Sequence, residues 1–463
     1  MNYDLNLMAL PPVFAASALY DSLLQSALRQ FFGRATFETE PIPSLSSDGR
    51  LAIEPTNDPS VLSVRWFGSR HVLHVPARRP FTEHEVRLAK AIGAVLALRY
   101  RAIFDPKQML ERGDLFRGAI EDRYVAAFLE SLEKSAGGPS RADIVATMLE
   151  VLRVAALSSY ENRPISSGVL LMDGAGPSGA AMPTGPTGEP YKYSQALTAI
   201  KSFYRLSDGL GTLFLLNRDG IVLDVVGIER FAESLRAVNV PKPDVPGARA
   251  YCAHSLATAG NGNICVVLSP SHEIKIFAQG VEMFSFRNAR WHLLDVQAKY
   301  KMWEAAVGNA ALANRLFQTA LDLSDTRQGA LFVVLRDPAV SLPMIVAPAD
   351  RLDSPRARPS GDLPDRGQLL YMLRGKTAVG LDPAVLQNLA RMDGAMVMDG
   401  KGQLLAAGAI LLHSEPPDPH SALAVEGART TAAMAVARYA AVLKISEDGL
   451  ITFFEKQEKI WDI

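Results

Sequence analysis

The sequence is poor in cysteine, and this scarcity excludes two classes of protein. Its 463 residues include only two cysteines, Cys252 and Cys265. Two cysteines cannot form the dense disulfide framework of small secreted domains, and they cannot supply a cysteine-based zinc site. A reducing compartment suits such a chain, so we expect it to be cytoplasmic.

Long apolar runs and an excess of one charge are also missing. No stretch of 18 or more apolar residues is free of charges and prolines, so we expect no membrane span and no membrane partner. The first residues lack the basic start of a signal peptide. A net charge of −1 gives no overall attraction to nucleic acid, so we expect no nucleic-acid partner and a local site for any nucleotide.

Three motifs of common enzyme classes are absent as well. The sequence contains no Gly-x-x-x-x-Gly-Lys-Ser/Thr phosphate loop, no Gly-x-Ser-x-Gly nucleophile elbow and no His-x-x-x-His pair. What it does contain is ordinary globular material, with 48% hydrophobic and 21% charged residues. The length predicts two to four domains.

Residues 1–110 form a small mixed region. Alternating apolar residues predict strands over 62–67 and 71–75. A helix is expected to follow, with Thr82 as its N-cap and Glu85 at the capping-box position. Its apolar stripe favours a core-facing helix, which leaves two interpretations open: a sensor domain, or a scaffold or dimerisation region.

Two later stretches repeat one another. Each begins with Gly-Ala-Arg, at Gly247 and at Gly427, and continues as an alanine-rich segment of helical character. Each then has a strand that ends in a serine, Ser269 or Ser446, followed by a tight turn and a short strand. Five elements in the same order predict an internal duplication.

The repeat extends upstream and defines the predicted domains. A helix and a strand precede each copy, the strands beginning near Ser167 and Gln328, and an Asp-Gly pair leads into a hairpin at Asp208 and at Asp393. We expect a fold of the α/β class, α+β mixed, with two related units that each hold a mixed sheet flanked by helices. The predicted domains are residues 1–110, 111–305 and 306–463.

Asp393 and Gly394 stand at the entrance to a predicted strand. A glycine allows a ligand to approach the backbone closely. The carboxylate of Asp393 could hold a divalent metal or take a proton from a hydroxyl. The alternative is an ordinary hairpin-entry turn, in which Asp-Gly pairs are routine.

Gly427 and Arg429 stand at the start of a predicted helix. Free backbone N–H groups at such a start and the charge of Arg429 together suit a triphosphate. The alternative is a well-capped core helix without a ligand.

In order and spacing, residues from about Leu312 to Ile463 resemble a diadenylate cyclase domain. The resemblance rests on Asp393-Gly-Ala, on the small-residue strand from Ala406, on Gly427 with Arg429, and on Ser446 with Glu447. Residues 111–305 resemble a degenerate copy of the same domain, and residues 1–110 a sensor region. In the first copy Pro270 follows Ser269 and no acidic residue stands where Glu447 does, so we interpret this copy as non-catalytic.

The resemblance implies a role for each matching residue. Asp393 is the catalytic carboxylate, and Asp393 and Glu447 hold Mg²⁺ or Mn²⁺. The implied nucleotide-binding residues are Gly394, Ala395, Leu412, Gly427, Arg429, Thr430, Thr431 and Ser446. The family signature Gly-Thr-Arg-His-Arg is altered here, because Ala428, Thr430 and Thr431 replace its Thr, His and second Arg. One lost charge-assisted phosphate contact costs about 1.5–3 kcal/mol of binding.

These observations leave three functions open. The first is a nucleotidyltransferase that condenses two ATP molecules into cyclic di-AMP under the control of the amino-terminal half, and it requires a homo-oligomer, at least a dimer. The second is an inactive pseudo-cyclase that binds ATP or a cyclic dinucleotide as a sensor. The third is an assembly protein that keeps the fold alone.

Overall fold

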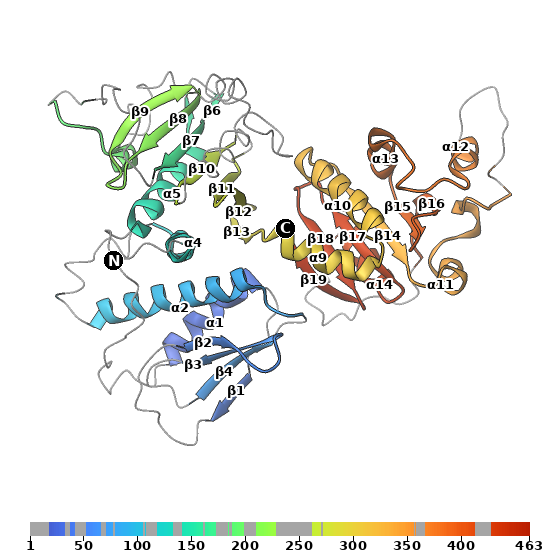
Figure 1. The fold of residues 1–463 in the computed structure, drawn as a ribbon, viewed down its shortest axis with the longest axis horizontal. Coiled ribbons are helices and arrows are strands. Elements are labelled where there is room, and N and C mark those ends of the chain that lie inside the picture. Colours follow the sequence, from blue (N-terminus) through green and yellow to red (C-terminus); the bar gives the residue numbers. More distant parts are fainter. Residues whose placement is uncertain are drawn as a thin grey trace. The chain divides into compact units, whose positions relative to one another are not determined.

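A computed structural model gives the fold of the chain (Figure 1). The structure describes residues 18–32, 38–41, 52–65, 71–76, 79–104, 107, 118–132, 141–160, 163–172, 184, 188–198, 210–227, 262–269, 272–355, 357, 366–412 and 427–463. Helices alternate with strands in three larger sheets, so the predicted α+β class is confirmed. The chain divides into two compact units, Met1–Leu294 and Asp295–Ile463.

The first unit begins with a small antiparallel sheet. Its strands lie in the order β1 (Glu38–Pro41), β4 (His71–Pro76), β3 (Val61–Arg65) and β2 (Ala52–Pro55). β3 and β4 are the two predicted strands, whereas β1 and β2 were not predicted. Helix α1 (Ala18–Phe32) packs on α2 (Glu83–Phe104), which is the predicted helix.

The predicted capping box starts α2. The backbone N–H of Glu85 donates to the Thr82 hydroxyl at 3.1 Å, and the N–H of Thr82 donates to the Glu85 carboxylate at 2.9 Å. Two backbone donors that a helix start leaves without partners are therefore satisfied.

A seven-stranded mixed sheet forms the rest of the first unit. Its order is β13 (Arg290–Leu293), β12 (Val281–Arg287), β11 (Ile274–Ala278), β10 (Ile264–Leu268), β7 (Ser166–Leu171), β8 (Leu210–Leu216) and β9 (Val222–Gly227). Helices α4 (Ile120–Ser131) and α5 (Ala142–Ala156) pack together, and α5 covers β7 and β10. A short 3-10 helix, η3 (Tyr193–Leu197), also packs on α5, and β5 (Ser159–Tyr160) pairs with β6 (Arg163–Pro164).

The second unit is built on a six-stranded mixed sheet. Its order is β16 (Leu404–Ala409), β15 (Ala395–Asp399), β14 (Ala330–Leu335), β17 (Ala440–Ile445), β18 (Ile451–Glu455) and β19 (Glu458–Asp462). Its helices are α9 (Val296–Val307), α10 (Ala310–Asp325), α11 (Pro338–Ile345), α12 (Arg366–Leu373), α13 (Pro383–Ala390) and α14 (Ala428–Val436), with a 3-10 turn η5 (Pro348–Asp350).

Helices cover both faces of this second sheet. β14 is buried at every position, as expected for a central strand covered on both sides. Figure 1 shows α9 and α10 across one face, where Trp303 packs edge-on against Phe453 at 5.4 Å between ring centroids. Val436 of α14 packs with Val333 and Val442 in a second core cluster. Helix α9 crosses the predicted boundary at residue 306 and belongs to the second unit.

The two large sheets have the same topology. In each, a central strand runs parallel to one neighbour and antiparallel to the other: β7 beside β8 and β10, and β14 beside β15 and β17. An antiparallel strand then follows on each side, β9 and β11 in one sheet, β16 and β18 in the other. This is the arrangement that the sequence repeat predicts, with β13 as an additional strand in the first unit.

In the part of the chain that the structure describes, no helix is both long enough and apolar enough to cross a bilayer.

Candidate functional site

The sheet topology of the second unit brings distant motifs to one edge. β14 and β15 are parallel, so the residues just before them, Gly329 and Gly394, lie at the same end of the sheet. β17 is antiparallel to β14, with Ile445 opposite Ala330, so the turn that follows β17 reaches that end too. The candidate site is this edge of the sheet.

Arg429 joins two of the predicted residues at this edge. Its Nη1 lies 3.2 Å from Glu447 Oε1, and its Nη2 lies 3.6 Å from Asp393 Oδ1. Asp393 is fully exposed and Glu447 is mostly exposed, whereas Arg429 is about one-third exposed. The guanidinium therefore lies between two accessible carboxylates that come from different turns of the chain.

Gly329 makes room for this guanidinium. A Cβ added to Gly329 would lie 2.0 Å from Arg429 Nη1 and 3.3 Å from Glu447 Cγ. Real side-chain atoms do not approach so closely, so the position of Arg429 depends on the missing side chain. Gly329 was not among the predicted site residues, although it lies at the start of the predicted strand and directly before β14.

A second pair of glycines shapes the turn at Asp393. Gly394 has a φ of +104°, and a Cβ there would lie 2.5 Å from the carbonyl carbon of Gly408. Gly408 has a φ of +59°, and a Cβ there would lie 3.2 Å from the Asp393 carbonyl oxygen. The entry to β15 and the end of β16 therefore approach one another backbone to backbone, which glycine alone permits without strain.

The amino-terminal end of α14 opens at the same edge. Gly427 is its N-cap, and no atom of the described residues lies within 4 Å of the position that a Cβ on Gly427 would occupy. The N–H groups of Thr430 and Thr431 donate to the Gly427 carbonyl at 2.9 and 3.3 Å. The backbone N–H groups of Ala428 and Arg429 come before the first hydrogen bond within the helix. They and the positive end of the helix dipole are therefore available to bind an anion.

The two threonines that follow Arg429 differ in environment. Thr430 is only 3% exposed, and its Oγ1 accepts a hydrogen bond of 2.5 Å from Lys444 Nζ. Thr431 is partly exposed. The hydroxyl of Thr430 therefore faces β17 rather than solvent, and Lys444 is a second residue that the sequence analysis did not single out.

The remaining predicted residues line the same edge or lie near it. Ala395 is buried in β15 opposite Ala409. Leu412 follows β16 and is exposed, with its N–H bonded to the Ile345 carbonyl at 2.8 Å. Ser446 is half-buried and closes the turn after β17 by accepting a hydrogen bond from the Gly449 N–H at 3.0 Å.

Arg366, a further basic residue, lies at the rim of this turn. Its Nη2 donates to the Gly408 carbonyl at 2.8 Å and lies 3.0 Å from Asp350 Oδ1. Gly408 belongs to β16 and lies close to the backbone of Asp393. Half-exposed Arg366 therefore lies near Asp393, next to the end of β16. Arg366 was not predicted as a site residue, because it follows a segment rich in charge and proline that is typical of a surface loop.

The carboxylates of this edge suit a hard divalent cation. Mg²⁺ in proteins is usually held by one or two carboxylates, with substrate phosphates and waters as further ligands. Within the described ranges, no three His, Cys, Asp or Glu side chains gather around one point. Asp393 and Glu447 are the two carboxylates at this edge that could contribute to such a site, and both contact Arg429.

In the first unit, one part of the corresponding edge is described. The turn of Ser269 repeats that of Ser446: the N–H of Ser269 donates to the Glu273 carbonyl, and the N–H of His272 donates back to the Ser269 carbonyl. His272 is exposed, with a φ of +64°, where the second unit has Gly449 at +85°. Asp208 and Arg249 lie outside the described residues.

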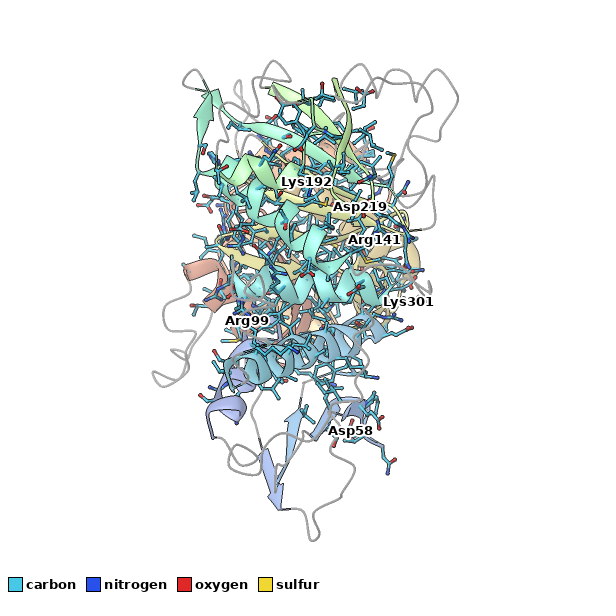
Figure 2. The ribbon with its side chains drawn as sticks, turned by 90° about the vertical axis from the view of Figure 1, so that its left-hand side faces the viewer. Asp58, Arg99, Arg141, Lys192, Asp219 and Lys301 are labelled. Atoms are coloured by element: carbon cyan, nitrogen blue, oxygen red, sulfur yellow. The ribbon has the colours of Figure 1, made fainter. Side chains whose placement is uncertain are left out.

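A buried ionic cluster holds the first unit together. Asp122 Oδ1 accepts a 2.8 Å hydrogen bond from Trp291 Nε1 and lies 2.9 Å from Arg153 Nη2. Burial raises the pKa of Asp122 to about 6, although Arg153 and the Trp291 hydrogen bond act in the opposite direction. Arg141, labelled in Figure 2, starts α5 and donates to the Gly262 carbonyl at 2.7 Å. These contacts link α4 and α5 to the sheet.

Comparison with solved structures gives 19 similar chains, two of which are described here. No family model and no curated protein matches the chain. A hypothetical membrane spanning protein from Bacillus cereus is 19% identical over 33% of this chain, with a TM-score of 0.23, and the chain spans 62% of its length. A double mutant of DacA from Staphylococcus aureus is 20% identical over 34% of this chain and 87% of its own, with a TM-score of 0.20.

Proposed function

We propose that the second unit is a diadenylate cyclase-type nucleotidyltransferase, which condenses two ATP molecules into cyclic di-AMP under the control of the first unit. The observation that carries the proposal is the meeting of Asp393, Arg429 and Glu447 beside the open start of α14. The order of the motifs in the sequence supports the reaction class. The contacts of Arg429 support a common site for the charged residues of those motifs.

The chemistry assigned to this edge is phosphodiester formation. The 3′-oxygen of one ATP attacks the α-phosphorus of the other, a new P–O bond forms, the α–β bridging bond breaks and pyrophosphate leaves. The proton of the 3′-hydroxyl passes to the Asp393 carboxylate, which is exposed and can accept it. Repetition with the two ATP roles exchanged closes the ring.

The cationic groups of the site would bind the phosphates. The guanidinium of Arg429 offers a planar set of donors, and the first-turn N–H groups of α14 offer neutral ones. When phosphate binds, Arg429 exchanges its contacts with the carboxylates for contacts with phosphate oxygens. Mg²⁺ or Mn²⁺ held by Asp393 and Glu447 would neutralise charge on the leaving group.

Each site presents one catalytic carboxylate, so two second units must face each other for the full reaction. We therefore include a homo-oligomer, at least a dimer, in the proposal. The dimer would bring the Asp393 of one chain to the α-phosphate bound by the other.

A second candidate is a pseudo-cyclase that binds ATP or a cyclic dinucleotide as a sensor. The burial of Thr430 favours it, because that hydroxyl is almost unexposed and already accepts a hydrogen bond from Lys444. The site then keeps Arg429 as its sole charge on the helix start, which is sufficient for binding but weaker for stabilising a transition state.

The two candidates are separated by a product assay. The full chain is incubated with ATP and Mg²⁺ or Mn²⁺, and the nucleotides are resolved by chromatography. If the natural chain forms cyclic di-AMP and Asp393→Asn does not, the protein is the enzyme. If the natural chain binds nucleotide but forms no product, it is the sensor. Asp382→Asn is the matched control, because Asp382 caps α13 through its bond to the Ala384 N–H and asparagine caps equally well.

A further inference from the structure

A lysine lies beneath the helix start of the candidate site. Lys444 belongs to β17, yet its ammonium donates to Thr430 Oγ1, in the first turn of α14, at 2.5 Å. Thr430 is almost fully buried, whereas Lys444 is half-buried. The strand therefore brings a positive charge to the turn in which the diadenylate cyclase signature has lost its histidine.

Strand register places Lys444 on the face of the sheet that carries the site. Lys444 lies opposite Leu331 of β14. Leu331 and Val442 belong to the core cluster that packs under α14, so Lys444 is on the α14 side. β17 ends at Ile445, opposite Ala330, so Ser446 and Gly329 come next at the edge of the sheet.

This arrangement stacks two cations on one face. Arg429 lies directly over Gly329, at the edge of the sheet. Lys444 is the second-last residue of β17, so it lies one residue inside the end of the strand at that edge. The start of α14 adds its own partial positive charge. Arg429, Lys444 and the helix start thus offer three positive groups on one face, beside the carboxylates of Asp393 and Glu447.

We propose that Lys444 is a phosphate-binding residue of this site and replaces, from the neighbouring strand, the charge missing from the helix start. Its ligand is the polyphosphate chain of a nucleotide. The proposal rests on the proposed function, because it assumes that the edge around Arg429 binds a nucleotide. It applies to the synthase and to the sensor alike, since both bind the phosphates.

The test compares binding of ATP, pyrophosphate and adenosine to the full chain by calorimetry. Lys444→Met should weaken ATP and pyrophosphate binding by about tenfold or more, the usual effect of losing a charge-assisted contact. Adenosine binding should stay unchanged, because adenosine carries no phosphate. Lys444→Arg keeps the positive charge, so it should retain more phosphate affinity than Lys444→Met.

Two further variants complete the design. Lys444→Gln keeps a donor for the Thr430 hydroxyl without the charge, so it should lose phosphate affinity even where Lys444→Met fails to fold. Lys401→Met is the control, because Lys401 is exposed in the hairpin turn at the opposite end of β15. Its affinity for ATP should equal that of the natural chain.

Each other outcome overturns the proposal in a distinct way. Unchanged ATP affinity in folded Lys444→Met and Lys444→Gln refutes the role of Lys444 and leaves the proposed function standing. If the Lys444 variants lose affinity for ATP and for adenosine equally, Lys444 has only a structural role. A natural chain that binds neither ATP nor pyrophosphate refutes the proposed function and this inference together.

Discussion

Gly329 and Arg429 depend on each other although a hundred residues separate them in the chain. The guanidinium occupies the volume that a side chain at position 329 would fill. From there it reaches both Asp393 and Glu447. The Arg429 guanidinium can therefore take this position only because residue 329 is a glycine and has no side chain.

Adding that methyl group should disable the site while the fold survives. In Gly329→Ala the new Cβ displaces Arg429 from Glu447, so ATP affinity measured by calorimetry should fall by about tenfold or more. The free energy of unfolding should change by about 1 kcal/mol or less, because the displaced group is the end of a flexible side chain.

Gly400→Ala is the matched control for this prediction. A Cβ at Gly400 meets no atom within 4 Å, so neither ATP affinity nor stability should change. ATP affinity that stays unchanged in Gly329→Ala as well would show that the position of Arg429 does not matter for the ligand.

Asp122 gives the first unit a pH-dependent stability. Burial raises its pKa to about 6 in the folded chain, above the value of about 3.9 expected when unfolded. The folded state therefore binds this proton more tightly. The resulting stabilisation is complete below about pH 4 and is lost as the pH rises through about 6.

Asp122→Asn should remove this dependence. Relative to the variant, the natural chain should lose about 2 kcal/mol of unfolding free energy between pH 4 and pH 7, because most of the shift of about two pKa units is expressed in that range. Urea denaturation across that range measures the difference. Asp143→Asn, at a half-exposed partner of Arg123, is the control. A constant difference between the natural chain and Asp122→Asn would contradict the assigned pKa.

Among the elements, the turns after β10 and β17 show how closely the two units correspond. Both strands are followed, at the same spacing, by their antiparallel partners: Leu268 pairs with Ile274, and Ile445 with Ile451. The two turns also share their backbone hydrogen bonds. In one, the left-handed residue is His272, and in the other it is Gly449.

Exchanging the residue at this position should affect the two turns in opposite directions. His272→Gly should stabilise the chain by up to about 1 kcal/mol, because glycine adopts a positive φ without the penalty that other residues incur. Gly449→Ala should destabilise it by about 1 kcal/mol for the same reason. Thermal unfolding measures both. A destabilising His272→Gly would mean that the histidine makes contacts that outweigh its strain.

The sequence was informative about elements and much less so about side-chain contacts. Strand alternation and the capping box predicted β3, β4 and the start of α2, because these signals are local. The orientation of Thr430 could not be predicted, since it depends on how α14 packs against β17. Lys444 was overlooked because a lysine within an apolar strand carries no motif, and Gly329 because its contact with Arg429 is long-range.

At the scale of the whole molecule, one sheet topology occurs twice in the chain. The two copies differ in sequence directly after the serine of the turn, where the second copy has Glu447 and the first has Pro270. This asymmetry predicts one nucleotide site for each chain, with the first unit as the regulatory part of the proposed function.

The most direct test of the account is calorimetric titration of the full chain with ATP, compared with the variants Arg429→Gln and Arg438→Gln. Arg438 is exposed just beyond the other end of α14 and serves as the control. We predict one ATP bound per chain, an affinity at least about tenfold weaker in Arg429→Gln and an unchanged affinity in Arg438→Gln. Absence of ATP binding, or equal affinity in Arg429→Gln, would contradict the assignment of the nucleotide site to this edge.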